Sequence, residues 1–508
     1  MALARARGRN TAKVALDPRT PVVVGVGQVT VPPVAGQGYD ERPTPLGLMG
    51  DALRAAADDA GAGGALLARL DEVVAIRSFV WRARDPAGLV LEALGLAPRP
   101  TALAPTGGSQ PQRLVAAAAR RIAAGELDAI AVVGAEATYA DRLARREGRP
   151  VDWPGHEVGP APVTEGRDHF TPEERRHGLA LPVGVYPLFE NARRARRGWT
   201  IDEHRARLGT LWAGFARVAA ENPYAWRRDA PDAAAIATPT PANRMIAFPY
   251  TKLLVANLPV DMGASLVLTS YRCARELGVS EEKMVFPQCA AEADDHWFVS
   301  ERPELDASPA MTAVWAALVD FGVEVDGLSP IDLYSCFPTV VETAAAVIGL
   351  DPLDPARPPT VTGGLTFAGG PGNNYVTHAI ATMVERLRER PAATGLVTGL
   401  GWFATEHAWG TYSATPPPDG FRWRDVGAPV AGAPRVEVAT GDGAMVVETY
   451  TVTHRPDGSA ERLIVCGRRA DGRRQWAHSD DAELAESAET RDLLHAPVRV
   501  RGGTLEPV

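Results

Sequence analysis

Apolar positions along the chain alternate between the period of a strand and the period of a helix. Val22–Gly27 is a β-branched run that ends in glycine, which indicates a buried strand, and a helix-like segment over 45–61 follows it. The segment 101–136 reads as strand, glycine-rich turn, helix and strand, with Pro111 in the first helical turn. The segment 358–401 has the same order. Two similar units predict a duplicated α/β core.

Two regions interrupt this alternation. The first, rich in Arg, Trp and His, is predicted to be a mostly helical insertion. Near the C-terminus, alternating apolar runs are separated by the hairpin signals Pro456-Asp-Gly458 and Asp471-Gly472, which predict a small antiparallel β domain. The predicted units are an N-terminal half at 20–265 with the insertion at about 138–244, a C-terminal half at 266–413, and the β domain at 421–508.

The amino-acid composition limits which ligands, partners and surroundings are expected for this protein. A net charge of -9 over 508 residues provides no basic field for a nucleic acid. Four widely spaced cysteines without a CxxC pair predict free thiols in a reducing cytoplasm. The sequence contains no run of about 18 apolar residues, so no membrane span is predicted. The acidic cluster at 292–296 is interpreted as a solvated loop, so no metal is expected.

Five segments carry a family resemblance. They are GGSQ with the later GELDAIAVVGAE, then AENPYAW, VDMGASLVL, IDLYSCF, and TGGLTFAGGPGNNYVTHA followed by GLVTGLG. In this order, over about 20–413, the chain resembles the thiolase superfamily in its sterol-carrier-protein-2-type branch. The resemblance implies a duplicated βαβαβαββ core in five layers, α-β-α-β-α. The tail resembles the small OB-like β domain that some actinobacterial thiolase-like proteins carry.

The residues that thiolases use for catalysis are replaced in this chain. The family uses a nucleophilic cysteine, a histidine base, a second cysteine and an HDCF loop on acyl-CoA thioesters. Aligned onto this sequence, the nucleophile position is Gly108, the histidine position is Gly370 and the second cysteine position is Val397. The HDCF loop becomes Tyr334-Ser335-Cys336-Phe337. The ordinary thiolase mechanism is therefore not expected.

Other side chains near these loops are candidates for moving a proton or holding the thioester. Each also has an ordinary structural interpretation, such as core packing, a helix cap or a solvated helix face. The candidate proton carriers are Tyr334, Cys336, Tyr375, His378 and His407. The loops expected to bind the substrate or its oxyanion contain Gly108, Ser109, Gly369, Gly370, Asn373, Asn374 and Gly399. The arginines expected near a CoA phosphate are Arg193, Arg194, Arg196 and Arg197.

Two functions remain open at this point. The favoured one is an enzyme that acts on an acyl-CoA thioester, as an acyltransferase or a C–C bond lyase. The alternative is a catalytically inert acyl-CoA-binding or scaffold protein of lipid or sterol metabolism. Both imply coenzyme A thioester as substrate or ligand, no permanently bound cofactor, and a homodimer or a small β-domain partner. The enzyme requires at least two candidate side chains around one pocket near Gly108 and Gly370, and a site filled by apolar side chains would contradict it.

Overall fold

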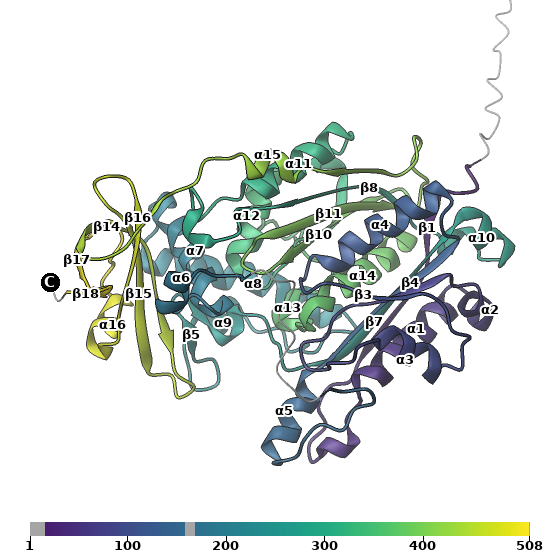
Figure 1. Ribbon diagram of the computed structural model, residues 1–508, viewed down its shortest axis with the longest axis horizontal. Coiled ribbons are helices and arrows are strands. Elements are labelled where there is room, and N and C mark those ends of the chain that lie inside the picture. The colour runs from purple at the N-terminus through teal and green to yellow at the C-terminus, as the bar shows by residue number, and fades with distance from the viewer. Residues whose placement is uncertain (1–15, 158–167, 507–508) are drawn as a thin grey trace, which may run out of the picture.

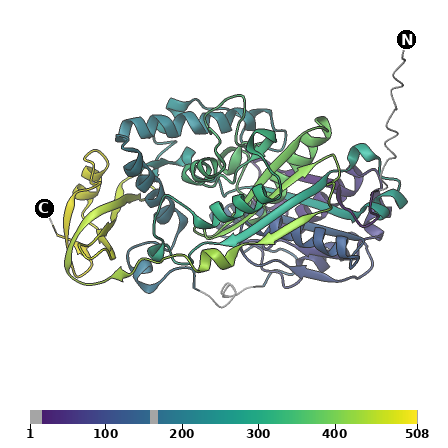
Figure 2. The same ribbon diagram turned by 90° about the horizontal axis from the view of Figure 1, so that it is seen from above.

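The computed structural model describes residues 16–157 and 168–506. The molecule is elongated, with an α/β core at one end and the C-terminal β domain at the other (Figure 1). The view from above shows helices of the insertion between these two ends (Figure 2). Within the described residues, no helix combines the length and the apolar character needed to cross a membrane.

The first sheet of the core has five strands in the order β1-β7-β4-β2-β3. Their bounds are β1 Pro21–Thr30, β2 Glu72–Ala75, β3 Thr101–Leu103, β4 Ala129–Ala137 and β7 Asp261–Ser270. β7 runs antiparallel to both neighbours, β1 and β4, along its whole length. The boundary expected between residues 265 and 266 therefore lies inside β7, and the first half continues at least to Ser270.

The second sheet has five strands in the order β12-β8-β11-β10-β9. Their bounds are β8 Phe286–Asp294, β9 Leu328–Asp332, β10 Thr394–Gly401, β11 Glu406–Ser413 and β12 Arg422–Asp425. β11 is antiparallel to β8 and β10, and β10 is parallel to β9. The run β8-β11-β10-β9 thus repeats the run β1-β7-β4-β2, which confirms the predicted duplication.

Helices α4 (Gln110–Ala124) and α14 (Tyr375–Glu389) lie between the two sheets and contact both (Figure 1). α1 (Pro45–Asp59) and α3 (Pro86–Ala93) cover the outer face of the first sheet. α11 (Pro309–Asp320) covers the outer face of the second. The expected five-layered α-β-α-β-α core is present. Its remaining helices are α2 Gly63–Ala68, α10 Tyr271–Glu276, α12 Pro338–Ile348, α13 Gly364–Phe367 and α15 Gly427–Ala431.

The insertion is helical where it is described. Its helices are α5 Thr138–Arg146, α6 Pro172–Arg176, α7 Pro182–Arg197, α8 Ile201–Glu221 and α9 Ala233–Ala237. Two short strands follow, β5 (Met245–Ala247) and β6 (Tyr250–Thr251). β5 pairs with a strand of the C-terminal domain at Thr453, so the insertion extends that domain's sheet.

The C-terminal domain is built on the two predicted hairpins. Its strands and helix are β13 Val438–Ala439, β14 Gly443–His454, β15 Ala460–Arg468, β16 Arg474–Ser479, β17 Pro497–Arg501, β18 Thr504–Leu505 and α16 Ala482–Ala488. The turns between β14, β15 and β16 fall on the two Asp-Gly signals. The domain begins later than residue 421, because β12 pairs with β8 in the second core sheet.

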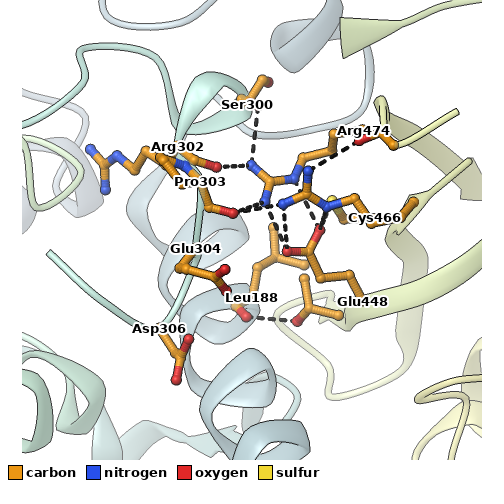
Figure 3. A network of polar contacts seen from close by, with 12 residues as sticks. Leu188, Ser300, Arg302, Pro303, Glu304, Asp306, Glu448, Cys466 and Arg474 are labelled. Atoms are coloured by element: carbon orange, nitrogen blue, oxygen red, sulfur yellow. Dashed lines mark hydrogen bonds and ion pairs between the residues drawn. The ribbon is translucent and has the colours of Figure 1, made fainter. Parts of the chain in front are cut away.

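A buried arginine fastens this domain to the core (Figure 3). Arg474 donates from Nε and Nη2 to the Glu448 carboxylate at 3.0 and 2.8 Å. Its Nη1 donates to the main-chain oxygen of Ser300 at 3.1 Å. Thr449 adds a hydrogen bond to the Leu188 carbonyl at 2.6 Å. A buried guanidinium needs acceptors for its N–H groups, and Arg474 finds them both in its own domain, at Glu448, and in the core, at Ser300. These bonds fix how the domain sits on the core.

Candidate functional site

A cavity of about 1030 Å³ opens where the core meets the insertion. Most of its lining comes from seven segments: the loop after β2 (77–86), the loop before α4 (106–108), the start of α7 (180–186), the segment before β7 (255–258), the loop after β9 (334–337), the loop before α14 (372–373) and the end of β10 with the loop after it (400–403). Aliphatic and aromatic side chains such as Leu103, Val255 and Phe403 make up most of the wall. The size and the apolar wall are those of a small-molecule site.

The side chain of Tyr334 stands at the position of the family's nucleophile. A β-carbon at residue 108 would lie 2.5 Å from the Tyr334 hydroxyl and 2.5 Å from the Leu400 carbonyl oxygen. Tyr334 is only 7% exposed, and its hydroxyl makes no hydrogen bond with the described residues. Burial raises the pKa of Tyr334, so the hydroxyl stays neutral and can donate a hydrogen bond.

Cys336 lines the same wall as Tyr334 and is half-buried. Burial raises the pKa of its thiol to about 12. The neighbouring Tyr186 hydroxyl donates to the Trp402 carbonyl at 2.7 Å, and its ring stacks on Phe337 with centroids 4.5 Å apart. Because the thiolate is the nucleophilic form, this thiol is weakly reactive at neutral pH.

The loop before α4 presents backbone rather than side chains to the cavity. Gly107 and Gly108 line the wall, and the Gly108 amide has no acceptor among the described residues. The Ser109 side chain is fully buried and its hydroxyl donates to the Glu406 carboxylate at 2.8 Å. Gly108 lies just before the N-cap Ser109 of α4, next to the Tyr334 hydroxyl. Its amide is therefore available as a donor near that hydroxyl, while the Ser109 side chain points away.

The loop before α14 divides into a part that faces the cavity and a part that does not. Gly372 and Asn373 line the wall, and Asn373 accepts from the Gly107 amide at 3.0 Å and donates to the Arg77 carbonyl at 2.8 Å. The Gly370 amide donates to the Asn257 carbonyl at 3.0 Å, away from the cavity. Three other predicted loop residues, Gly369, Asn374 and Gly399, are packed in the core and do not line it.

Three candidate proton carriers lie outside the cavity lining. The Tyr375 hydroxyl donates to Asp332 at 3.1 Å. His378 Nδ1 lies 2.9 Å from Gln28 Oε1, and burial lowers the pKa of this histidine to about 3. His407 Nε2 lies 3.1 Å from the Ala404 carbonyl, and burial lowers its pKa to about 4. Both faces of α14 are buried because it lies between two sheets, so its polar face meets β1 instead of a pocket.

The structure does not bring the arginine run to the cavity. The cavity touches the start of α7, whereas Arg193–Arg197 lie at its end, about 10 Å or more further along the helix axis. Arg194 pairs with Asp492 at 2.6 Å, and Arg196 pairs with Asp306 at 2.6 Å. Arg193 donates to the Asp306 carbonyl at 3.0 Å. These side chains join α7 to the segment before α11, to α12 and to the C-terminal domain.

One buried group has the composition of a metal site. Ligand atoms of Glu190, His204 and Glu342 lie within 4.8 Å of one another. His204 is bonded to Glu190 at 2.9 Å, and Arg207 donates to Glu342 at 2.6 Å. Arg193 lies 3.9 Å from Glu342 as well. Because two arginines already balance the two carboxylates, the group is better explained as an ion-pair network than as a cation site.

The sequence analysis missed a carboxylate below the cavity wall. Glu136 is fully buried at the end of β4, and its oxygens accept from the Phe79 amide at 2.6 Å and the Ser78 hydroxyl at 2.8 Å. Burial raises its pKa to about 7. Its only signal in the sequence was an acidic residue inside an apolar strand. Glu136 fixes the loop that carries Phe79 to the cavity.

Comparison with known proteins places the chain in a family. A family model described as "Thiolase-like protein type 1 additional C-terminal domain" matches residues 426–503. No curated protein matches the chain. The solved structure of a monomeric SCP2-thiolase like protein type 1 from Mycobacterium smegmatis is 32% identical, with a TM-score of 0.81, over 97% of this chain and 100% of that chain.

Two further solved structures share the fold at low identity. One is the Ltp2-ChsH2(DUF35) aldolase, at 18% identity and a TM-score of 0.56, over 78% of this chain and 98% of that chain. The other is an acetyl-CoA acetyltransferase from Syntrophomonas wolfei, at 16% identity and a TM-score of 0.54, over 78% of this chain and 99% of that chain. The homodimer or partner protein expected from the sequence stays a prediction. On the full-length match to the mycobacterial protein, the chain belongs to the SCP2-thiolase-like proteins of type 1.

Proposed function

We propose that this protein binds an acyl thioester, such as an acyl-CoA, in the cavity without forming a covalent acyl intermediate. The observation that supports this most directly is the Tyr334 hydroxyl, which faces an apolar cavity at the nucleophile position and has no hydrogen-bond partner among the described residues. A polar group in such a setting gains a hydrogen bond when a ligand carbonyl arrives. The Gly108 amide is a second donor for the same oxygen.

The residues around this point argue against covalent acyl transfer. The hydroxyl of Ser109 is buried and already bonded to Glu406. The thiol of Cys336 has a pKa raised by burial to about 12. No histidine lines the cavity within residues 16–157 and 168–506. Nucleophilic catalysis needs an activated nucleophile with a base in reach, and neither candidate meets that requirement.

A lyase acting beside the thioester is the second candidate. The same two donors, the neutral Tyr334 phenol and the Gly108 amide just before α4, would also stabilise an enolate oxygen. Such a reaction forms no acyl-enzyme, so the loss of the cysteine and the histidine does not exclude it. Conversion of an acyl-CoA detected by mass spectrometry would favour this function over binding alone.

The variant Tyr334→Phe tests the binding proposal. We expect its affinity for dodecanoyl-CoA, measured by calorimetric titration, to fall about tenfold, because one hydrogen bond to the carbonyl is lost. Tyr271→Phe is the matched control, since in the described structure that hydroxyl also makes no hydrogen bond but lies in α10 outside the cavity. Equal affinity in Tyr334→Phe and wild type would exclude the proposed role of the hydroxyl, and absence of binding to wild type would exclude the function.

A further inference from the structure

Two arginines at the cavity mouth have no counter-charge among the residues that the structure describes. Arg77, Arg82 and Arg84 all line the cavity. Arg84 forms an ion pair with Glu157. The guanidinium groups of Arg77 and Arg82 form no ion pair or hydrogen bond with the described residues, in contrast to Arg194 and Arg196. Within residues 16–157 and 168–506, the mouth therefore carries two cations that no carboxylate balances.

Large exposed apolar side chains surround the same opening. The described chain has six of them, and three line the cavity: Phe79 is 51% exposed, Leu181 63% and Leu258 49%. Exposing such side chains to water is unfavourable, and their concentration at one place marks a binding surface. The mouth thus combines apolar contact area with positive charge.

The loop that carries these residues is held in place. Glu136 accepts hydrogen bonds from the Ser78 hydroxyl and the Phe79 amide at 2.8 and 2.6 Å. Asn373 donates to the Arg77 carbonyl at 2.8 Å. Anchored backbone on both sides of Ser78 presents Arg77 and Phe79 in a fixed position, which lowers the entropy that a ligand must overcome on binding.

The cavity is large for a short acyl group. Its volume of about 1030 Å³ is at the upper end of the range of roughly 300–1,000 Å³ for small-molecule sites. An acetyl group would leave most of the apolar wall without contact, and each methylene added to the ligand would bury more of it.

We infer that the cavity takes an anionic amphiphile: a long or polycyclic acyl group fills the interior, and Arg77 and Arg82 hold an anionic group at the mouth. This rests on the proposed function and names its ligand class. The anion is a phosphate if the ligand is a CoA thioester, or a carboxylate if it is a free acid. Guanidinium groups bind both through charge-assisted hydrogen bonds.

The test measures the binding of four probes: dodecanoyl-CoA, acetyl-CoA, dodecanoic acid and dodecanol. Binding is followed by calorimetry and by tryptophan fluorescence, since Trp81 and Trp402 line the cavity. The double variant Arg77→Gln/Arg82→Gln is expected to bind dodecanoyl-CoA about tenfold or more weakly than wild type, with a smaller dependence on salt. Dodecanol binding is expected to change less than twofold. Dodecanoyl-CoA is expected to bind wild type at least about a hundredfold more tightly than acetyl-CoA.

The control removes two cations elsewhere. Arg390→Gln/Arg491→Gln changes the net charge equally, at the end of α14 and in the C-terminal domain, and should leave all affinities within about twofold. If Arg77→Gln/Arg82→Gln weakens the binding of dodecanoyl-CoA alone, the anion held at the mouth is a phosphate. If it weakens the binding of dodecanoic acid, that anion is a carboxylate. If wild type and the double variant bind dodecanoyl-CoA and dodecanoic acid equally well, this inference is overturned, but the proposed function is not. Equal binding of acetyl-CoA and dodecanoyl-CoA overturns the filling of the interior. No binding of dodecanoyl-CoA to wild type overturns the proposed function.

Discussion

The two halves of the core present equivalent glycine loops to different surroundings. The loop before α4 faces the cavity at Gly108, where the Tyr334 hydroxyl fills the place of a side chain. The loop before α14 packs at Gly370 against the backbone of Asn257 and leaves only Gly372 and Asn373 at the wall. At the cysteine position a polar group thus faces the cavity, and at the histidine position the chain is packed in the core. Equivalent topology does not preserve equivalent roles.

A buried carboxylate lies behind each loop. Ser109 donates to Glu406 behind the first, and a β-carbon at Gly372 in the second would lie 2.6 Å from Glu136. Only Glu136 accepts the two hydrogen bonds that position the loop with Phe79 at the mouth. Substitutions that disturb one loop and spare the other can separate packing from ligand binding.

The largest expected effect is on the pH dependence of stability through Glu136. Burial raises its pKa from 4.5 to about 7 in the folded protein, so the folded state binds more protons than the unfolded state between these values. Stability should therefore fall as pH rises from 4.5 to 7, by at most about 3 kcal/mol from this group. Glu136→Gln should flatten that part of the profile, measured as the unfolding midpoint at pH 5, 6, 7 and 8. Parallel profiles for variant and wild type would contradict the buried ionisation.

Adding a methyl group to each loop contrasts their packing. Gly108→Ala places a β-carbon 2.5 Å from both a hydroxyl and a backbone oxygen, so we expect a loss of about 2–3 kcal/mol in the free energy of unfolding. At Gly370 the nearest atom is the Asn257 oxygen at 3.2 Å, so Gly370→Ala should cost about 1 kcal/mol or less. Urea unfolding measures both. A larger loss at residue 370 than at residue 108 would reverse the comparison.

The two tyrosines near these loops should separate stability from affinity. Tyr375→Phe removes the hydroxyl that is bonded to Asp332 and Thr362, and should lower the free energy of unfolding by about 1–2 kcal/mol. Tyr334→Phe removes a hydroxyl that no described residue binds and should leave the free energy of unfolding within about 0.5 kcal/mol of wild type. A large destabilisation by Tyr334→Phe would indicate a structural role for its hydroxyl.

The smallest effect is a change in the reactivity of Cys336. Cys273, Cys289 and Cys466 are buried, so alkylation by iodoacetamide should occur first at Cys336. Because burial raises the pKa of this thiol to about 12, the rate should rise about tenfold for each pH unit between 7 and 9. Bound dodecanoyl-CoA should slow it. A rate that the ligand does not affect would place the ligand outside this wall.

Much of the fold could be predicted because it depends on local patterns. The two glycine-to-helix units and the Asp-Gly hairpins were recognisable as short stretches and are confirmed. The boundary at 265 was misplaced because the extent of β7 depends on pairing with β1 and β4, which lie far away in the chain. The sequence placed His378 on a polar helix face, but α14 lies between two sheets and its residues 375–384 are all buried.

By itself, the sequence determined the duplicated α/β core, the loss of the thiolase cysteines and histidine, and the additional β domain, because residue identity and hydrophobic period are properties of short segments. Only the tertiary structure decided that Tyr334 faces the cavity and that three of the four arginines of α7 are bound to protein oxygens. It also decided that Arg77 and Arg82 lie at the mouth without an ion-pair partner in the described part of the chain. Each of those depends on burial and on partners from distant segments, which set the hydrogen bonding and the pKa of a side chain.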